Sequence, residues 1–164
     1  MKNILLVFSA AIIMMTSCQS KPTAPPVNLN KHAQVKVAYE ERDGLKVIPV
    51  KLNGVSMDMI YDSGCTGVHL SLLELQQLVK QGCFSEEDIL GTTLSTIADG
   101  SIVENGKILL HSIEIGPDLV LEDVEATVSL NHEAPLLLGN SVLDELATNI
   151  EVDNVAKEII FTKR

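Results

Sequence analysis

Apolar and polar residues alternate along most of the chain after residue 33, a period that is typical of β-strands. Residues 46–52 and 55–61 alternate on either side of Asn53-Gly54, the dipeptide favoured in two-residue hairpin turns. This pattern predicts a β-hairpin whose second strand ends directly before Asp62. Further strands are predicted over residues 35–39, 92–98, 101–104, 107–115, 119–128, 135–140, 149–152 and 158–162.

Three groups of turn residues interrupt the middle of the chain. Asp99-Gly100 predicts a hairpin between residues 92–98 and 101–104. Asn105-Gly106 permits another turn, and Gly116-Pro117-Asp118 joins the two longest strand candidates. Together these signals predict a β meander.

Helical spacing replaces the alternation in the part of the chain between the first hairpin and the meander. Ser71 to Glu74 fits a capping box, and leucines follow at helical intervals, which predicts a helix over residues 71–81. Ser85 begins a shorter helical turn that Gly91 is expected to end. One more short helix is expected near residues 142–147.

The amino-terminal part of the chain has a different composition. Residues 1–17 carry one Lys before a short apolar run, which predicts a secretory signal peptide that is too short to span a membrane as a mature helix. The small residues before Cys18 resemble a bacterial lipobox, so lipidation of the Cys18 thiol is expected, while a plain signal peptide with a chance cysteine stays open. Residues 18–32 are proline-rich and predict a flexible, lipid-anchored tether in the bacterial cell envelope. Residues 33–164 then form a single domain.

The charge and the histidines exclude some functions. The formal net charge is −10, and phosphate binding needs an excess of Lys and Arg, so nucleic acid is not an expected partner. His32, His69, His111 and His132 lack the spacing of a metal motif. We expect no metal and no cofactor.

Asp62 follows a mostly apolar strand, where a carboxylate is costly unless it is satisfied or used. Ser63 and Thr66 supply hydroxyl groups beside it, and Gly64 allows a close turn of the backbone. Asp-Ser-Gly is also ordinary turn chemistry. The motif alone therefore leaves open both a structural turn and a working carboxylate.

The segment from Ile60 to Thr66 resembles the active-site signature of the retropepsin-like aspartic proteases. That signature is an apolar run followed by Asp-Thr/Ser-Gly-Ala-Ser/Thr, and Cys65 stands where the family usually has Ala.

The resemblance extends from about Lys46 to the carboxyl end. Ala98-Asp99-Gly100 resembles the tip of a flap, and Leu138-Gly139-Asn140 resembles the element that packs behind the catalytic loop. The implied fold is mainly β, a single-lobe acid protease with a closed, barrel-like sheet and a helical insert at about residues 71–90.

The resemblance implies an aspartic endopeptidase that works as a homodimer. The chain contains one Asp-Ser-Gly, so the second acid would be the Asp62 of a partner copy. Two such carboxylates would share one proton, and together they would activate water and polarise the scissile carbonyl. By the same resemblance, Ser63 braces the two loops and Thr66 orients the acid. The expected partner is a peptide or protein substrate, bound in an extended form under the flaps.

Other interpretations of these residues stay open. A non-catalytic peptide-binding or assembly lipoprotein would keep the same fold. Cys65 and His69 suggest a thiol nucleophile, but a strand over residues 68–70 would point them to different sites. Cys65 fits better as a small buried residue, or as half of a disulfide with Cys83. Ser63 is not expected to be a nucleophile, because the sequence has no Gly-x-Ser-x-Gly elbow.

Overall fold

The structure of the protein, a computed structural model, describes residues 33–164. The predicted signal peptide, the lipidation site at Cys18 and the tether lie outside the described residues. Within the described part of the chain, no helix is both long enough and apolar enough to cross a membrane.

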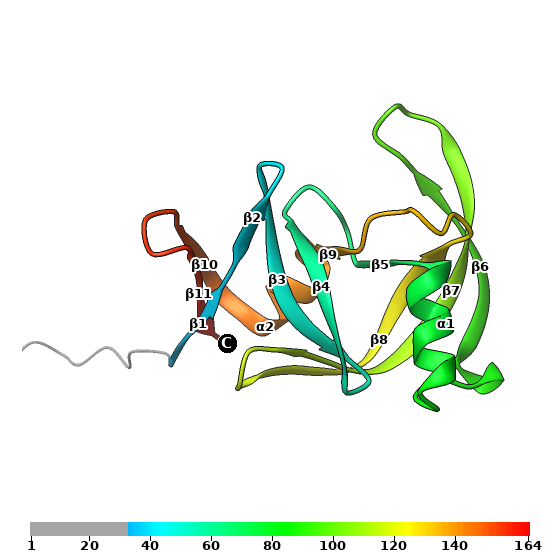
Figure 1. Ribbon diagram of the computed structural model, residues 1–164, viewed down its shortest axis with the longest axis horizontal. Coiled ribbons are helices and arrows are strands. Elements are labelled where there is room, and N and C mark those ends of the chain that lie inside the picture. Colours follow the sequence, from blue (N-terminus) through cyan, green and yellow to red (C-terminus); the bar gives the residue numbers. More distant parts are fainter. Residues whose placement is uncertain (1–32) are drawn as a thin grey trace, which may run out of the picture. The chain divides into compact units, whose positions relative to one another are not determined.

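The described residues form two β-sheets (Figure 1). The smaller sheet has the order β1-β11-β10 and is antiparallel. The larger sheet has the order β2-β3-β4-β9-β5-β8-β7-β6, and an additional pairing of β3 with β7 closes it on itself. This closure agrees with the predicted barrel-like, mainly β fold. The strands are β1 (Gln34–Ala38), β2 (Glu40–Arg42), β3 (Leu45–Leu52), β4 (Val55–Asp62), β5 (Val68–Ser71), β6 (Ile89–Thr96), β7 (Ile102–Ile115), β8 (Leu119–Ser129), β9 (Leu137–Gly139), β10 (Ala147–Asp153) and β11 (Glu158–Lys163), and the helices are α1 (Leu72–Lys80), the 3-10 helix η1 (Glu86–Asp88) and α2 (Asn140–Leu146).

Alternate side chains of the strands fill the barrel. In β3 and β4 every second residue points inward, and Ile48, Leu52 and Met59 are completely buried. Burial of these aliphatic side chains is the main favourable contribution to folding. The alternation seen in the sequence is therefore the alternation between core and surface.

The β3–β4 hairpin has the predicted turn. Asn53 and Gly54 have φ angles of 48° and 81°, the left-handed conformation that a type I′ turn requires at both positions. The Asn53 side chain accepts a hydrogen bond from Ser112 N at 3.1 Å and donates one to the Cys83 carbonyl at 2.8 Å. These bonds fix the register of the strand that ends at Asp62.

Helix α1 is the helix predicted over residues 71–81. Ser71 is its N-cap: the Ser71 hydroxyl accepts a hydrogen bond from Leu73 N at 3.1 Å, and Ser71 N donates to Glu74 Oε2 at 3.2 Å. This is the predicted capping box. Helix α2 corresponds to the short helix predicted near residues 142–147.

Two of the turn predictions are wrong. The helical turn at η1 ends before Gly91, because β6 already begins at Ile89; Gly91 lies within this strand, and its φ of 116° accommodates a register shift against β7. Asn105-Gly106 forms no turn but lies inside the continuous strand β7, opposite Thr92 and Thr93 of β6. Pairing with β6 on one side and β8 on the other outweighs the local turn preference of this dipeptide.

Candidate active site

Strand β9 holds both ends of the loop that follows Asp62. It pairs with β4 in parallel, with Gly139 opposite Asp62, and with β5 in antiparallel, with Leu138 opposite Val68. Because β4 and β5 flank β9, residues 63–67 are confined to a tight loop between them (Figure 1). The position of Asp62 is thus set by three strands.

Hydrogen bonds from residues 139 and 140 fix the backbone of this loop. Gly139 N donates to the Gly67 carbonyl at 2.8 Å, and Asn140 N donates to the Cys65 carbonyl at 2.8 Å. The Asn140 amide Nδ2 donates to the Ser63 carbonyl at 2.6 Å. A Cβ atom at Gly139 would lie 2.5 Å from the Cys65 carbonyl oxygen, so no larger residue fits there without displacing the loop. The segment predicted to pack behind the loop lies directly against it.

The Asp62 carboxylate is half-buried and is held from one side. Its Oδ1 atom accepts a hydrogen bond from Gly64 N at 2.9 Å, and its backbone carbonyl accepts one from Cys65 N at 3.2 Å. Within residues 33–164, the hydroxyl groups of Ser63 and Thr66 form no hydrogen bond with it. In a single chain the acid is therefore oriented by the loop backbone, and not by the Thr66 hydroxyl.

The predicted flap is the tip of the β6–β7 hairpin. Ile97 N donates to the Ser101 carbonyl at 3.0 Å, and Gly100 N donates to the Ile97 carbonyl at 2.8 Å. The Asp99 carboxylate accepts a hydrogen bond from Ser101 N at 2.8 Å, and this backbone N–H lowers the pKa of Asp99. Asp99 thus stabilises the turn. Of the three predicted flap residues, Ala98 lines the same cavity as Asp62, whereas Asp99 and Gly100 do not.

A cavity of about 750 Å³ lies between the Asp62 loop and this hairpin. The sequence pattern did not single out its side walls, which come from β5, β7, β8 and the segment before β9. Its lining includes Asp62, Gly64, Cys65 and Thr66 from the loop, residues 93–98 and 103 from the hairpin, and His69, Asn105, Thr127, Ser129, Pro135 and Leu137 from the walls. A cleft of this size and mixed polarity is suited to a segment of peptide.

The family model described as "gag-polyprotein putative aspartyl protease" matches residues 48–145. This match spans more than half of the chain and contains both the Asp62 loop and Gly139. The chain belongs to the retropepsin-like aspartic proteases. The resemblance found in the Asp62 motif is thereby confirmed at the level of the family.

A solved structure confirms the fold of this family member. The crystal structure of a retropepsin-like aspartic protease from Rickettsia conorii is similar with a TM-score of 0.54 and 22% sequence identity, over 79% of this chain and 89% of that one. The solution structure of Simian Foamy Virus (mac) protease is similar with a TM-score of 0.41 and 17% identity, over 60% of this chain and 91% of that one. No curated protein matches the sequence.

Cys65 does not form a nucleophilic pair with His69 in this retropepsin-like domain. The His69 Nε2 atom donates to the Thr66 carbonyl at 3.1 Å, and the Cys65 sulfur donates to that same carbonyl at 3.6 Å. Burial and the neighbouring Asp62 charge raise the pKa of Cys65, which keeps the thiol protonated and weakly nucleophilic. Cys65 and Cys83 are both free, so the disulfide left open by the sequence is not formed.

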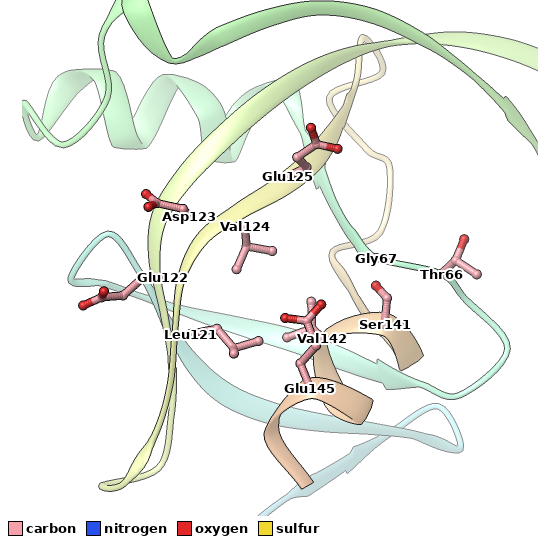
Figure 2. Close-up of a pocket in the computed structure, with 10 residues that line it drawn as sticks. All are labelled: Thr66, Gly67, Leu121, Glu122, Asp123, Val124, Glu125, Ser141, Val142 and Glu145. Atoms are coloured by element: carbon pink, nitrogen blue, oxygen red, sulfur yellow. The ribbon is translucent and has the colours of Figure 1, made fainter. Parts of the chain in front are cut away.

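A second cavity, of about 440 Å³, borders the same loop at Thr66 and Gly67 and lies between β8 and α2 (Figure 2). Its rim carries four carboxylates, from Glu122, Asp123, Glu125 and Glu145. Glu125 is paired with Lys107 at 2.7 Å. Among residues 33–164, no group of three or more His, Cys, Asp or Glu side chains is arranged to hold a metal ion.

Proposed function

We propose that this protein is an aspartic endopeptidase whose active site is completed by a second copy of the chain. The proposal rests on the Asp62 loop, in which one carboxylate, bonded by Gly64 N at 2.9 Å, opens onto a cavity of about 750 Å³ under a hairpin. One chain supplies one such carboxylate, because the sequence contains a single Asp-Ser-Gly.

In this mechanism the two Asp62 carboxylates lie together and share one proton, because two like charges a few ångströms apart raise the pKa of one member. The ionised carboxylate takes a proton from water, and the water oxygen attacks the scissile carbonyl carbon. The protonated carboxyl group donates its proton to the carbonyl oxygen, and the carboxyl group that took the water proton then passes it to the amide nitrogen as the C–N bond breaks. The two pKa values belong to the dimer rather than to either chain.

The substrate is a peptide or protein segment bound in an extended form between the loop and the hairpin. Its main chain supplies hydrogen-bonding groups to the hairpin, while the cavity walls select side chains. Ser63 is exposed, and its hydroxyl is unbonded within residues 33–164, so it is available to brace the loop of the partner copy. Thr66 is likewise exposed beside it.

We also propose that residues 1–17 are a lipoprotein signal peptide and that the Cys18 thiol anchors the protein to a membrane of the bacterial cell envelope. The support is the charge and apolar pattern before Cys18 and the proline-rich segment after it. Labelled palmitate is expected to be incorporated into the wild-type protein and not into Cys18→Ala. Equal labelling of both proteins would contradict lipidation at this residue.

Mixing experiments test whether the active site requires two chains. When wild-type protein is mixed with an equal amount of Asp62→Asn at constant total concentration, random pairing leaves about one quarter of the dimers with two acids. Specific activity per total chain is therefore expected to fall to about a quarter of the wild-type value. Asp58→Asn, an exposed position on the same strand, is the control partner and is expected to cause no loss. A fall to one half with Asp62→Asn would indicate that each chain works alone.

A further inference from the structure

One part of the wall of the Asp62 cavity, formed by His69, Thr127 and Ser129, is polar, whereas Leu94, Val103 and Leu137 make other parts of the wall apolar. In β8, Ala126 and Val128 are buried in the core, while the intervening Thr127 and the following Ser129 point to the opposite face and line the cavity. The register places His69 of β5 beside Thr127 on this face. The hydroxyl groups of Thr127 and Ser129 and the imidazole of His69 thus occupy positions that an apolar pocket would fill with aliphatic side chains.

The next strand continues this polar wall with Asn105. In β7 it occupies the same face as Lys107, which is paired in register with Thr127. Asn105 is 7% exposed, and its Nδ2 donates to Ser95 Oγ of β6 at 2.9 Å. It is one of the few buried polar residues of the domain, and a buried amide is costly when its groups are unpaired.

Within residues 33–164, the Asn105 side chain makes one hydrogen bond, from Nδ2 to Ser95 Oγ. Its carbonyl oxygen therefore has no hydrogen-bond partner there. In the described part of the chain, every fully buried side-chain nitrogen or oxygen atom has a hydrogen-bond partner. The Asn105 oxygen must therefore keep some open surface, and the cavity is the space that this residue lines. An acceptor and the second N–H of the amide are left for a ligand.

The neighbouring polar groups of the wall already form hydrogen bonds within the protein. Both ring nitrogens of His69 are bonded, Nε2 to the Thr66 carbonyl at 3.1 Å and Nδ1 to Thr127 Oγ1 at 2.6 Å. Ser129 Oγ accepts a hydrogen bond from Asn131 N at 3.2 Å, which leaves the hydroxyl proton of Ser129 to donate. Among residues 33–164, no Lys, Arg, Phe, Tyr or Trp lines the cavity.

Given the proposed peptidase function, on which this inference rests, we propose that this wall is a specificity subsite for an uncharged, hydrogen-bonding side chain of the peptide, and that Asn105 is its determinant. A carboxamide side chain, Asn or Gln, fits best. Its N–H donates to the Asn105 oxygen, and its carbonyl oxygen accepts from the second Asn105 N–H or from the Ser129 hydroxyl. A leucine side chain would cover the Asn105 carbonyl oxygen without giving it a hydrogen bond, and an acidic one would lie in a cavity that already holds Asp62.

The test uses peptides that differ at one position, which carries Gln, Asn, Leu, Glu or Lys. For the wild-type protein we expect kcat/KM for Gln and Asn to exceed that for Leu by about tenfold or more, since a site built for a hydrogen bond rejects a ligand that lacks it. In Asn105→Leu the order of Leu and Gln is expected to reverse. A wild-type preference for Leu, or an unchanged order in Asn105→Leu, would overturn the proposal.

Two further proteins control for folding and position. Asn149→Leu makes the same substitution at an exposed site of β10, where within residues 33–164 the Asn149 amide bonds only Glu151, and it is expected to keep the wild-type order. Ser95→Ala removes the partner of the Asn105 amide without adding bulk, and it is expected to weaken the preference for Gln. Melting temperatures of all variants establish that each is folded.

Binding measurements separate a failure of the subsite from a failure of the proposed function. The same peptides, labelled with a fluorophore, are titrated against Asp62→Asn by anisotropy. Tighter binding of Gln than of Leu supports the subsite even if hydrolysis does not depend on Asp62. Equal binding of Gln and Leu, in a protein whose hydrolysis requires Asp62, overturns the subsite and leaves the peptidase standing.

Discussion

Replacing Asp62 by Asn is expected to lower kcat/KM for peptide hydrolysis by at least about 10³-fold, the loss typical of removing a general acid-base group. The amide can neither take a proton from water nor share one with the second carboxyl group. Its oxygen can still accept the hydrogen bond from Gly64 N, so the loop should keep its shape. Initial rates on a peptide library, with melting temperatures of the same samples, measure the effect.

Asp58→Asn is the matched control for this substitution. It makes the same chemical change on β4, at an exposed residue whose contact is a surface ion pair with Arg42 at 2.7 Å. Such pairs contribute about 1 kcal/mol or less, and activity should be retained.

Three other outcomes of these experiments would indicate a different mechanism or a different function. Full hydrolysis by Asp62→Asn would exclude the aspartic mechanism. Loss of hydrolysis in Cys65→Ala, together with sensitivity to thiol alkylation, would indicate a cysteine hydrolase. Peptide binding without hydrolysis, in the wild type as well as in Asp62→Asn, would indicate a binding or assembly protein that keeps the fold.

Gly139→Ala is expected to destabilise the domain by about 2–4 kcal/mol and to abolish hydrolysis, because overpacking and loss of backbone hydrogen bonds add together. The new methyl group would lie 2.5 Å from the Cys65 carbonyl oxygen and 2.7 Å from that of Gly67. The loop must then move away from β9, which breaks the bond from Gly139 N to Gly67. Urea unfolding curves give the stability change.

Gly106→Ala is the control for the loss of a glycine. Its Cβ would lie 3.7 Å from Val128, an ordinary contact, and Gly106 has no positive φ. Since alanine is generally more favourable than glycine in a strand, we expect stability to be unchanged or higher by up to about 1 kcal/mol. Equal stability of Gly139→Ala and Gly106→Ala would show that the loop does not depend on close packing at residue 139.

Local signals in the sequence predicted the elements that depend on neighbouring residues. Asn53-Gly54 predicted its hairpin because both residues tolerate the left-handed conformation, and Ser71 predicted the start of α1 through its capping box. The turn predicted at Asn105-Gly106 is wrong for the opposite reason. Its turn preference is local, whereas its actual conformation is decided by strands β6 and β8 on either side.

In the candidate active site, too, features encoded by neighbouring residues were predictable and features that depend on strand pairing were not. The Asp62 loop was recognisable because its motif is continuous in the sequence, and Gly139 was recognisable from its own short motif. The contact of His69 with Thr127 joins residues 58 positions apart. It depends on the parallel register of β5 and β8, which no local pattern encodes. The polar wall therefore became visible only once the strands were in place.

The dependence of the Asp62 loop on β9 has a consequence for biosynthesis. The bond from Asn140 to Ser63 spans 77 positions, so a growing chain that extends only as far as the β6–β7 hairpin lacks the partner that holds the Asp62 loop. The Asp62 loop therefore cannot take its final form until β9 has been synthesised and has inserted between β4 and β5.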